Sequence, residues 1–426
     1  MAEQFYQYSD PDRITGAVDA LSAMTEHDRP FTRLVFSDEY KAARAWLQSQ
    51  FEEIGLECRT DAGGNLIGTR KAASSGEPPR KVIIGSHIDT VTAGGRFDGI
   101  AGVIAGLETV HYLNQNNITL PFDIEIIDFL GEELNVWGTS CLGSRHMAGL
   151  LNDDLLARKD QDGRQLSDEV HKAGGTGIAA TAPRQDAESI IACLELHIEQ
   201  SNRLEREGID IGVVIDIPGI SRHAITVTGS AGHSGTTRMQ ERKDALVTAS
   251  HIVTTIRDFA LEISSQDNRH FVATIGRIEV YPNGAAIIPG QVSMILDLRA
   301  SNAVSRDRFL SSLQLAFAEI SSRETCEIGM DPISAASVAL MDDTLRTHLA
   351  NSSEELGLSH ISIASGAGHD MAHMSRIAPA AMVFIPCKDG LSHCPDEFAT
   401  PEAIARGSAV LTHTVLKLAG GDIRSG

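Results

Sequence analysis

The stretch GSHIDTVTAGGRFDGIAG, residues 85–102, directly follows an apolar run at residues 82–84. An apolar run bounded by glycine predicts a buried strand, with His87 and Asp89 at its C-terminal end. Residues i and i+2 of a strand share a face, so we expect these two side chains to point the same way. That arrangement suits a metal-ligating histidine whose second ring nitrogen is held by a carboxylate.

The segments around this stretch alternate between strand and helix. Asp98 lies on a glycine-rich turn that opens a predicted helix at residues 99–112, and a strand at 122–130 ends on Glu132 and Glu133. Residues 190–199 alternate in polarity, which places Glu195 and His197 on one face of a further strand. This alternation predicts an α/β domain with a mixed, largely parallel sheet and helices on both faces.

The pattern changes between residues 218 and 333. Strands are predicted at 223–229, 272–280 and 292–299, and helices at 244–261 and 306–322. This β-α-β-β-α order is typical of a small α+β unit of the ferredoxin-like kind. Strand and helix patterns of the first type return afterwards. We therefore predict a domain formed by 1–217 and 334–426, with a smaller domain, 218–333, inserted in it.

The composition of the 426 residues limits the classes of partner. A formal net charge of −21 argues against nucleic acid or an anionic membrane surface, and leaves a small-molecule substrate open. The six cysteines are scattered without a CxxC pair, which indicates free thiols and a cytoplasmic protein. No apolar run approaches the length of a membrane span, and the N-terminus lacks a signal-peptide pattern.

Several acidic and imidazole side chains follow predicted strands or border glycine turns. Alone, each has an ordinary explanation: a hydrogen-bonded structural pair, a solvated glutamate pair or a buried core histidine. Together they match the need of two divalent ions for about five nitrogen and oxygen ligands, one of them shared. The candidate ligands are His87, Glu133, His197 and His393, with Asp98 as the bridge, and Glu132 is the candidate general base.

Seven motifs occur in an order and spacing that resemble a known family: GSHIDTVTAGGRFDGIAG, FLGEE, LELHIEQ, TVTGSAGHSGTT, DLR, SGAGHD and LSHCPDEF. From about residue 35 to its end, the chain resembles the metal-dependent amidohydrolases of the M20 peptidase superfamily. The similar branch holds N-carbamoyl-L-amino acid hydrolases, β-ureidopropionases and allantoate amidohydrolases. Histidine at position 197, where peptidase-type relatives more often have a carboxylate, favours the hydrolases of ureido groups.

The resemblance implies roles for individual positions. It assigns the five ligands above to two ions of zinc, manganese, cobalt or nickel, makes Glu132 the catalytic base and lets Asp89 orient His87. It also implies that the smaller domain is a lid and the interface of a homodimer. His233 would polarise the scissile carbonyl, and Arg299 would bind a substrate carboxylate. Further substrate-binding positions implied by the motifs are Gln200, Gly368 and His369.

Three departures from the family pattern lie around the expected substrate. Ala286 replaces an asparagine that usually helps to bind the substrate carboxylate, Ser201 and Asn202 replace a Gly-Pro pair, and residues 134–137 read LNVW. None removes a predicted ligand, so we predict intact chemistry with altered specificity.

The predicted function is binuclear-metal hydrolysis of a non-peptide C–N bond in a small amide or ureido compound. The alternatives are an aminoacylase, a dipeptidase, an aromatic-amine deaminase, or a catalytically silent small-molecule-binding protein. A purely structural dimer scaffold would leave the polar strand ends without an explanation.

Overall fold

Two separate hydrophobic cores divide the chain into two units. The computed structural model describes residues 4–73, 79–266 and 269–420. Unit 1 comprises Met1–Ile215, Leu340–Ile363 and Ala367–Gly426, and unit 2 comprises Asp216–Ala339 and Ala364–Gly366. Each unit has its own cluster of buried apolar side chains. A helix long and apolar enough to cross a membrane is absent from the described ranges.

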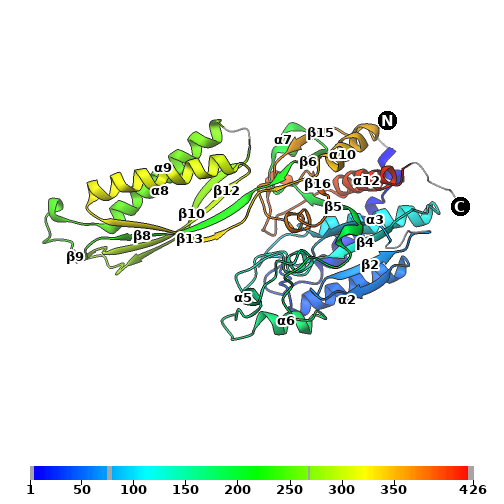
Figure 1. The fold of residues 1–426 in the computed structure, drawn as a ribbon, viewed down its shortest axis with the longest axis horizontal. Helices are drawn as coiled ribbons and strands as arrows, with labels where there is room; N and C mark the ends of the chain where they lie inside the picture. Colours follow the sequence, from blue (N-terminus) through cyan, green and yellow to red (C-terminus); the bar gives the residue numbers. More distant parts are fainter. Residues whose placement is uncertain (1–3, 74–78, 267–268, 421–426) are drawn as a thin grey trace. The chain divides into compact units, whose positions relative to one another are not determined.

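Unit 1 is built on an eight-stranded mixed sheet (Figure 1). The spatial order is β1-β2-β4-β3-β5-β16-β6-β15. Strands β4, β3, β5 and β16 are mutually parallel, as are β6 and β15, whereas the pairs β1–β2, β2–β4 and β16–β6 are antiparallel. The strands are β1 (Glu57–Thr60), β2 (Leu66–Arg70), β3 (Lys81–Ser86), β4 (Asp123–Asp128), β5 (Ile190–Ile198), β6 (Ile211–Val214), β15 (His360–Ile363) and β16 (Ala380–Ile385).

Helices cover both faces of this sheet. Leu196 of β5 lies against Gly407 of α12, whereas the next residue, His197, contacts His369, just before α11. Consecutive strand residues point to opposite faces, so α12 and α11 lie on opposite sides. The helices of unit 1 are α1 (Pro11–Ser22), α2 (Asp38–Glu53), α3 (Ile100–Gln115), α4 (Leu142–Met147), α5 (Asp153–Leu156), α6 (Leu166–Lys172), α7 (Arg203–Glu207), α10 (Asp343–Glu355), α11 (Met371–Met374) and α12 (Pro401–Leu418), with 3-10 turns at Gln4–Gln7, Ala187–Ser189 and Lys388–Gly390.

Strands β3 and β5 mark a reversal in the winding of the sheet. From β3 the chain crosses through α3 to β4 on one side, and it later returns to form β5 on the other side of β3. In α/β sheets, ligands bind beyond the carboxyl ends of strands at such a reversal. The loops after β3 and β5 are therefore placed for a site.

Unit 2 has a four-stranded antiparallel sheet in the order β10-β12-β8-β13, with α8 and α9 packed against it and against each other (Figure 1). Its sequence order, β8-α8-β10-β12-α9-β13, is the complete ferredoxin-like β-α-β-β-α-β. The elements are β8 (Gly219–Thr228), α8 (Ala245–Gln266), β10 (Phe271–Tyr281), β12 (Gln291–Ala300), α9 (Ala303–Glu324) and β13 (Glu327–Ala335), with the short strands β9 (Gly232–His233) and β11 (Ile287–Ile288) and a turn at Met239–Glu241. Two further short strands are β7 (Asp216–Ile217) and β14 (Ala339–Leu340).

The fold class predicted from the sequence is confirmed, with local differences. Strand β3 ends at Ser86, so His87 and Asp89 lie on the loop beyond it, and the two-residue rule for a strand does not apply to them. Helix α4 is short because Cys141, just before it, has a left-handed backbone with φ of 54°, and Gly149, just after it, one of 72°. Strands β6 and β13 were not predicted.

A buried group of charges holds β3 and β4 together. Glu125 of β4 is almost fully buried and accepts hydrogen bonds from Lys81 (3.1 Å), Arg59 (3.1 Å) and Arg184 (3.1 Å). Burial alone would raise the pKa of Glu125, but Arg184, Lys81 and Arg59 outweigh burial and hold that pKa below its ordinary value. The ionised carboxylate therefore stabilises unit 1.

We expect Glu125→Gln to lower the free energy of unfolding of unit 1 by about 2 kcal/mol at pH 7, since charge-assisted hydrogen bonds are lost. Because the folded-state pKa of Glu125 is depressed, its contribution is complete above the ordinary pKa and is lost as the pH falls through the folded-state pKa. The difference between wild type and variant should therefore shrink in acid. Urea unfolding at pH 7 and pH 3 measures it, with Trp46 and Trp137, both in unit 1, as fluorescent probes. A difference that stays constant with pH would contradict the assignment.

Candidate metal centre

Three segments of unit 1 bring imidazole and carboxylate groups to one place. His87 follows β3, His197 lies near the end of the neighbouring parallel strand β5, and Asp98 lies just before α3. The carboxyl ends of parallel strands meet at one edge of a sheet, which explains why residues so distant in sequence converge. All three side chains are buried.

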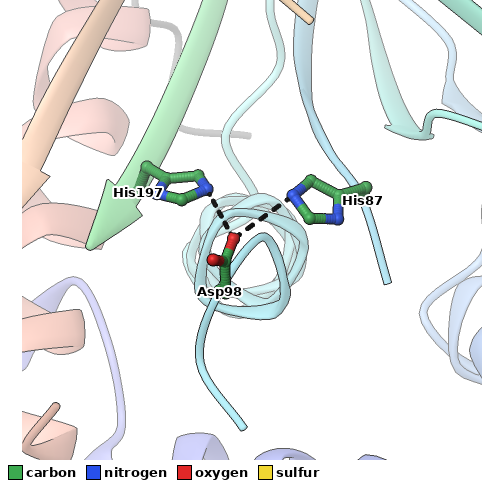
Figure 2. A group of neighbouring side chains, drawn as sticks. All are labelled: His87, Asp98 and His197. Atoms are coloured by element: carbon green, nitrogen blue, oxygen red, sulfur yellow. Dashed lines mark ion pairs between the residues drawn. The ribbon is translucent and has the colours of Figure 1, made fainter. Parts of the chain in front are cut away.

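The first ligand group consists of His87, Asp98 and His197. Figure 2 shows both rings turned toward one oxygen of the carboxylate: Asp98 Oδ1 lies 3.5 Å from His87 Nε2 and 3.1 Å from His197 Nε2. The potential ligand atoms all lie within 4.8 Å of one another. Because Zn–N and Zn–O bonds are about 2 Å long, such spacing can accommodate one ion between the three groups.

The other ring nitrogens of these histidines fix which atom faces Asp98. His87 Nδ1 lies 3.0 Å from the backbone oxygen of Asp89, and His197 Nδ1 lies 2.9 Å from that of Ile198. A carbonyl oxygen only accepts, so Nδ1 carries the proton in each ring and Nε2 of the neutral ring offers a lone pair. His87 Nε2 is buried without a hydrogen-bond partner. When the rings are neutral, both Nε2 lone pairs face the Asp98 carboxylate, and a cation bound between them would be favourable, so this donor set fits a metal ion.

The second ligand group shares the same aspartate. Asp98 Oδ2 lies 3.3 Å from His393 Nε2, which in turn lies 3.3 Å from Glu133 Oε1. Asp98, Glu133 and His393 again keep their ligand atoms within 4.8 Å. Asp98 thus presents one oxygen to each group, which is the arrangement of a carboxylate between two metal ions.

The electrostatics reflect this crowding of opposite charges. Burial alone would raise the pKa of Asp98, but the three histidines hold it well below its ordinary value. Burial lowers the pKa of His197, yet Asp98 outweighs burial and raises it to about 9. Burial, together with Asp98 and Glu132, raises the pKa of Glu133 well above its ordinary value. A bound cation would reverse this last effect and favour the ionised carboxylate.

Glu132 lies beside the first ligand group. Its Oε2 is 3.7 Å from His87 Nε2, and Cys141 Sγ lies 3.5 Å from its Oε1. Burial and the neighbouring carboxylates Asp89 and Asp98 raise the pKa of Glu132. A raised pKa brings a carboxylate closer to the range in which it exchanges protons at neutral pH, as a general base requires.

Asp89 has a structural role that the sequence did not predict. Its two carboxylate oxygens accept hydrogen bonds from the backbone N–H groups of Glu132 and Glu133, each at 3.1 Å. Asp89 Oδ1 also lies 3.5 Å from His87 Nδ1. One buried carboxylate therefore positions the glutamate pair and lies beside the ring that it was expected to orient.

Two glycines and Glu397 set the backbone around Asp98. Gly99 has φ of 68°, and a Cβ there would come within 2.4 Å of the His87 ring. A Cβ on Gly95 would come within 1.9 Å of the Glu397 carboxylate. Glu397 Oε1 accepts hydrogen bonds from the backbone N–H groups of Phe97 (2.9 Å) and Asp98 (3.0 Å). Glycine is therefore needed at position 99 to leave room for the His87 ring, and at position 95 to leave room for the Glu397 carboxylate.

The predicted substrate-binding positions of unit 1 lie at or near these groups. Gln200 donates its Nε2 to Asp98 Oδ2 at 2.7 Å, so in this structure it holds the shared aspartate. Gly368 precedes the buried His369, whose ring packs edge-on against His197 at 4.5 Å. Burial and the neighbouring His197 hold the pKa of His369 well below its ordinary value, so its ring is neutral.

The predicted substrate-binding positions of unit 2 are held by local contacts. His233 is exposed, and its Nδ1 accepts from the backbone N–H groups of Gly235 (3.0 Å) and Thr236 (3.3 Å), so the neutral ring carries its proton on Nε2. Arg299 donates to Asp297 (3.0 Å) and to the backbone oxygen of Gly366 (3.1 Å).

Ala286 lies behind the loop that carries His233. Its backbone oxygen accepts from the N–H of Ser234 at 3.0 Å, while its methyl side chain carries no group that could donate to a ligand. Ala286 thus keeps a backbone contact next to His233 but lacks the side-chain amide of the asparagine that it replaces.

Sequence reasoning assigned no role to three polar residues at the centre. Ser392 Oγ lies 3.0 Å from Asp98 Oδ2 and 2.9 Å from Glu397 Oε2, and its one hydroxyl proton can be donated to either carboxylate. Glu195, fully buried, accepts from Ser86 at 2.7 Å and forms a further group of close ligand atoms with His197 and His369. Burial raises the pKa of Glu195 to about 7. The alternation at 190–199 places Glu195 on the same strand face as His197, whereas Glu397 has no comparable local signal.

Comparison with known proteins gives a consistent picture. The model of the family described as Peptidase family M20/M25/M40 matches residues 83–417. An N-carbamoyl-L-amino acid amidohydrolase of Geobacillus stearothermophilus is 33% identical over 391 residues, covering 92% of this chain and 94% of that protein. An allantoate amidohydrolase of Bacillus subtilis is 32% identical over 394 residues, covering 92% and 93%. The crystal structure of an amidase of the hydantoinase/carbamoylase family from Burkholderia multivorans matches with a TM-score of 0.87 and 32% identity, covering 96% and 98%.

Proposed function

Because the chain belongs to peptidase family M20/M25/M40, we propose that it is a metal-dependent amidohydrolase of a small ureido or amide compound. It acts on carbon–nitrogen bonds other than peptide bonds, and its substrate resembles an N-carbamoyl amino acid, as the names of its relatives suggest. The observation that carries the proposal is the position of Asp98, which offers one carboxylate oxygen to each of two ligand groups.

The five ligands are suited to two divalent ions of zinc, manganese, cobalt or nickel. His87 and His197 would hold one ion, Glu133 and His393 the other, and Asp98 both. Ions bound there would lower the pKa of a water molecule toward neutrality and polarise the substrate carbonyl. Gln200, Ser392 and Glu397 hold Asp98 and its backbone in place.

Glu132 moves the protons in this proposal. Its Oε2 faces the first ligand group and accepts a proton from the attacking water. The same carboxyl then returns that proton to the leaving nitrogen. An N-carbamoyl substrate would consume one water and yield the free amine, carbon dioxide and ammonia.

Unit 2 supplies the remaining substrate contacts. His233 offers an Nε2–H donor to the substrate carbonyl oxygen, supported by the hydrogen bonds that its Nδ1 accepts. Arg299 offers its guanidinium to a substrate carboxylate, with Asp297 holding the side chain. Because Ala286 stands in place of an asparagine, the site for the substrate carboxylate has one hydrogen-bond donor fewer.

The proposal includes a homodimer formed through unit 2. Strands β10 and β13 are the edges of its sheet, and Val272, Ile278 and Ile333 on them are exposed apolar side chains. Unpaired strand edges of this kind are suited to association between copies. We also place the protein in the cytoplasm, in keeping with six unpaired cysteines.

A substrate panel tests the proposed function. The metal-loaded enzyme is supplied with N-carbamoyl amino acids, N-acetyl amino acids, dipeptides and an aromatic amine, and ammonia and free amine are measured. We expect amine and ammonia in equal amounts from the carbamoyl compounds. Amine without ammonia from the acetyl compounds or dipeptides alone would replace the proposal with an acylase or dipeptidase. Ammonia released only from the aromatic amine would indicate a deaminase.

A further inference from the structure

A cavity of about 500 Å³ opens beside the second ligand group in unit 1. It is lined by residues 34–37, 89–92, 133–137 and Arg164. Glu133 therefore lies both in the proposed metal centre and in the wall of the cavity. The volume lies within the range of small-molecule pockets, which is about 300–1,000 Å³.

The lining of this cavity combines apolar and polar side chains. Half of its fourteen lining residues are aliphatic or aromatic. Leu134 and Val136, two residues apart in the sequence, expose 61% and 56% of their surface, so this part of the lining presents apolar surface to solvent. A ligand group that covered these side chains would gain hydrophobic free energy.

The charges around the cavity disfavour an anion. Arg164 is the basic residue of the lining, and its Nε donates to Asp160 at 2.7 Å, which neutralises the cation. The acidic residues Asp89 and Glu133 lie in the same wall. The net negative charge of this wall would repel a substrate carboxylate, so we place that carboxylate outside the cavity.

The aromatic wall is held rigidly. Trp137 donates its Nε1–H to the backbone oxygen of Arg164 at 2.8 Å, and the Arg164 guanidinium lies over its ring at 5.7 Å. Phe36 packs edge-on against Trp137 at 5.6 Å, from a left-handed backbone with φ of 68°. A bulky residue rarely adopts that conformation, so its ring position is maintained at a cost in strain.

We infer that this cavity binds a large apolar side chain of the substrate, of the size found in leucine or phenylalanine. The inference rests on the proposed function, because it assigns the cavity to another part of the same substrate. The carbonyl lies at the metal centre, the carboxylate lies outside the cavity, and the side chain attached to the nitrogen-bearing carbon enters past Glu133. The preferred substrates are thus N-carbamoyl derivatives of large apolar amino acids rather than small ureido acids.

Binding and turnover are measured separately to test this inference. In metal-loaded Glu132→Gln protein carrying Trp46→Phe, Trp137 is the remaining tryptophan and its fluorescence reports on the cavity. We expect N-carbamoyl-L-phenylalanine to bind at least about tenfold more tightly than N-carbamoylglycine and to change the emission, as burial of such a side chain implies. In the wild-type enzyme the same ratio should appear in kcat/KM.

A matched pair of variants tests whether the preference for a large apolar side chain arises in this cavity. Leu134→Asp should reduce the phenylalanine-to-glycine ratio about tenfold or more by placing a charge at the cavity rim. Leu261→Asp, at an equally exposed leucine of α8 (61%), should leave the ratio unchanged. Equal binding of the two ligands, or a preference that survives Leu134→Asp, would overturn the inference. Hydrolysis of no panel compound would refute the proposed function instead, while the fluorescence titration would still decide what the cavity binds.

Discussion

Glu132→Gln is expected to reduce kcat by about 10²–10⁴-fold while the protein keeps its fold and its metal ions. The amide cannot accept a proton from water or return one to the leaving nitrogen. Its oxygen can still occupy the place of Oε1, where Cys141 lies at 3.5 Å. Stopped assays for product amine, metal analysis of the purified variant and its thermal midpoint measure the three quantities.

A control must separate the loss of a base from the loss of a buried charge. Glu108 is buried, like Glu132, and its Oε1 is ion-paired with Arg13 Nε at 2.5 Å. Glu108→Gln should lower stability and leave kcat close to that of the wild type. If Glu132→Gln retained wild-type turnover, or lost turnover only together with its metal, the role of general base would be wrong.

Removal of metal is expected to lower activity by at least about a thousandfold, because electrophilic assistance by bound ions provides several kcal/mol. The thermal midpoint of the protein should fall as well, since ions that bind the folded state stabilise it. Without ions, Asp98, Glu132 and Glu133 lie close together with only histidine charges to offset them. Dialysis against a chelator, followed by calorimetry and assay, measures both effects.

Re-addition of single divalent ions completes this experiment. Zinc, manganese, cobalt and nickel are added one at a time, and the ion that restores activity at the lowest concentration is identified. His393→Ala provides a variant of the second ligand group alone, and we expect it to bind one ion tightly in place of two. Full activity in demonstrably metal-free protein would contradict the metal centre as a whole.

The sequence contained enough information to predict the elements around the centre but not all of their ends. The apolar run before His87 predicted β3, and alternation at 190–199 predicted β5. Strand β13 was not predicted because Glu327–Ala335 includes Pro332 and is mostly exposed. Its sequence therefore shows neither the apolar pattern of a buried strand nor a high strand propensity. Strand β6 is a four-residue buried run, too short for periodicity to identify.

The candidate ligands could be proposed from residue types at strand ends, but the contacts that hold them could not. Asp89 was expected to orient His87 on a shared strand face, whereas the chain turns after Ser86 and the carboxylate accepts the N–H groups of Glu132 and Glu133. Glu397 reaches Asp98 across about 300 positions, and nothing in LSHCPDEF distinguishes it from its neighbour Asp396. Such pairings depend on the three-dimensional path of the chain, which local pattern does not encode.

The position of β16 in the sheet of unit 1 has a consequence for synthesis on the ribosome. Residues 380–385 form the strand between β5 and β6, although they are translated almost two hundred residues after β5. His393 and Glu397 follow later still. A nascent chain therefore has a gap in its central sheet until residues 380–385 are translated, and an incomplete second ligand group until His393 is added. A chain that stops before residue 380 would lack both this central strand and the complete second ligand group, and we expect it to have no hydrolytic activity.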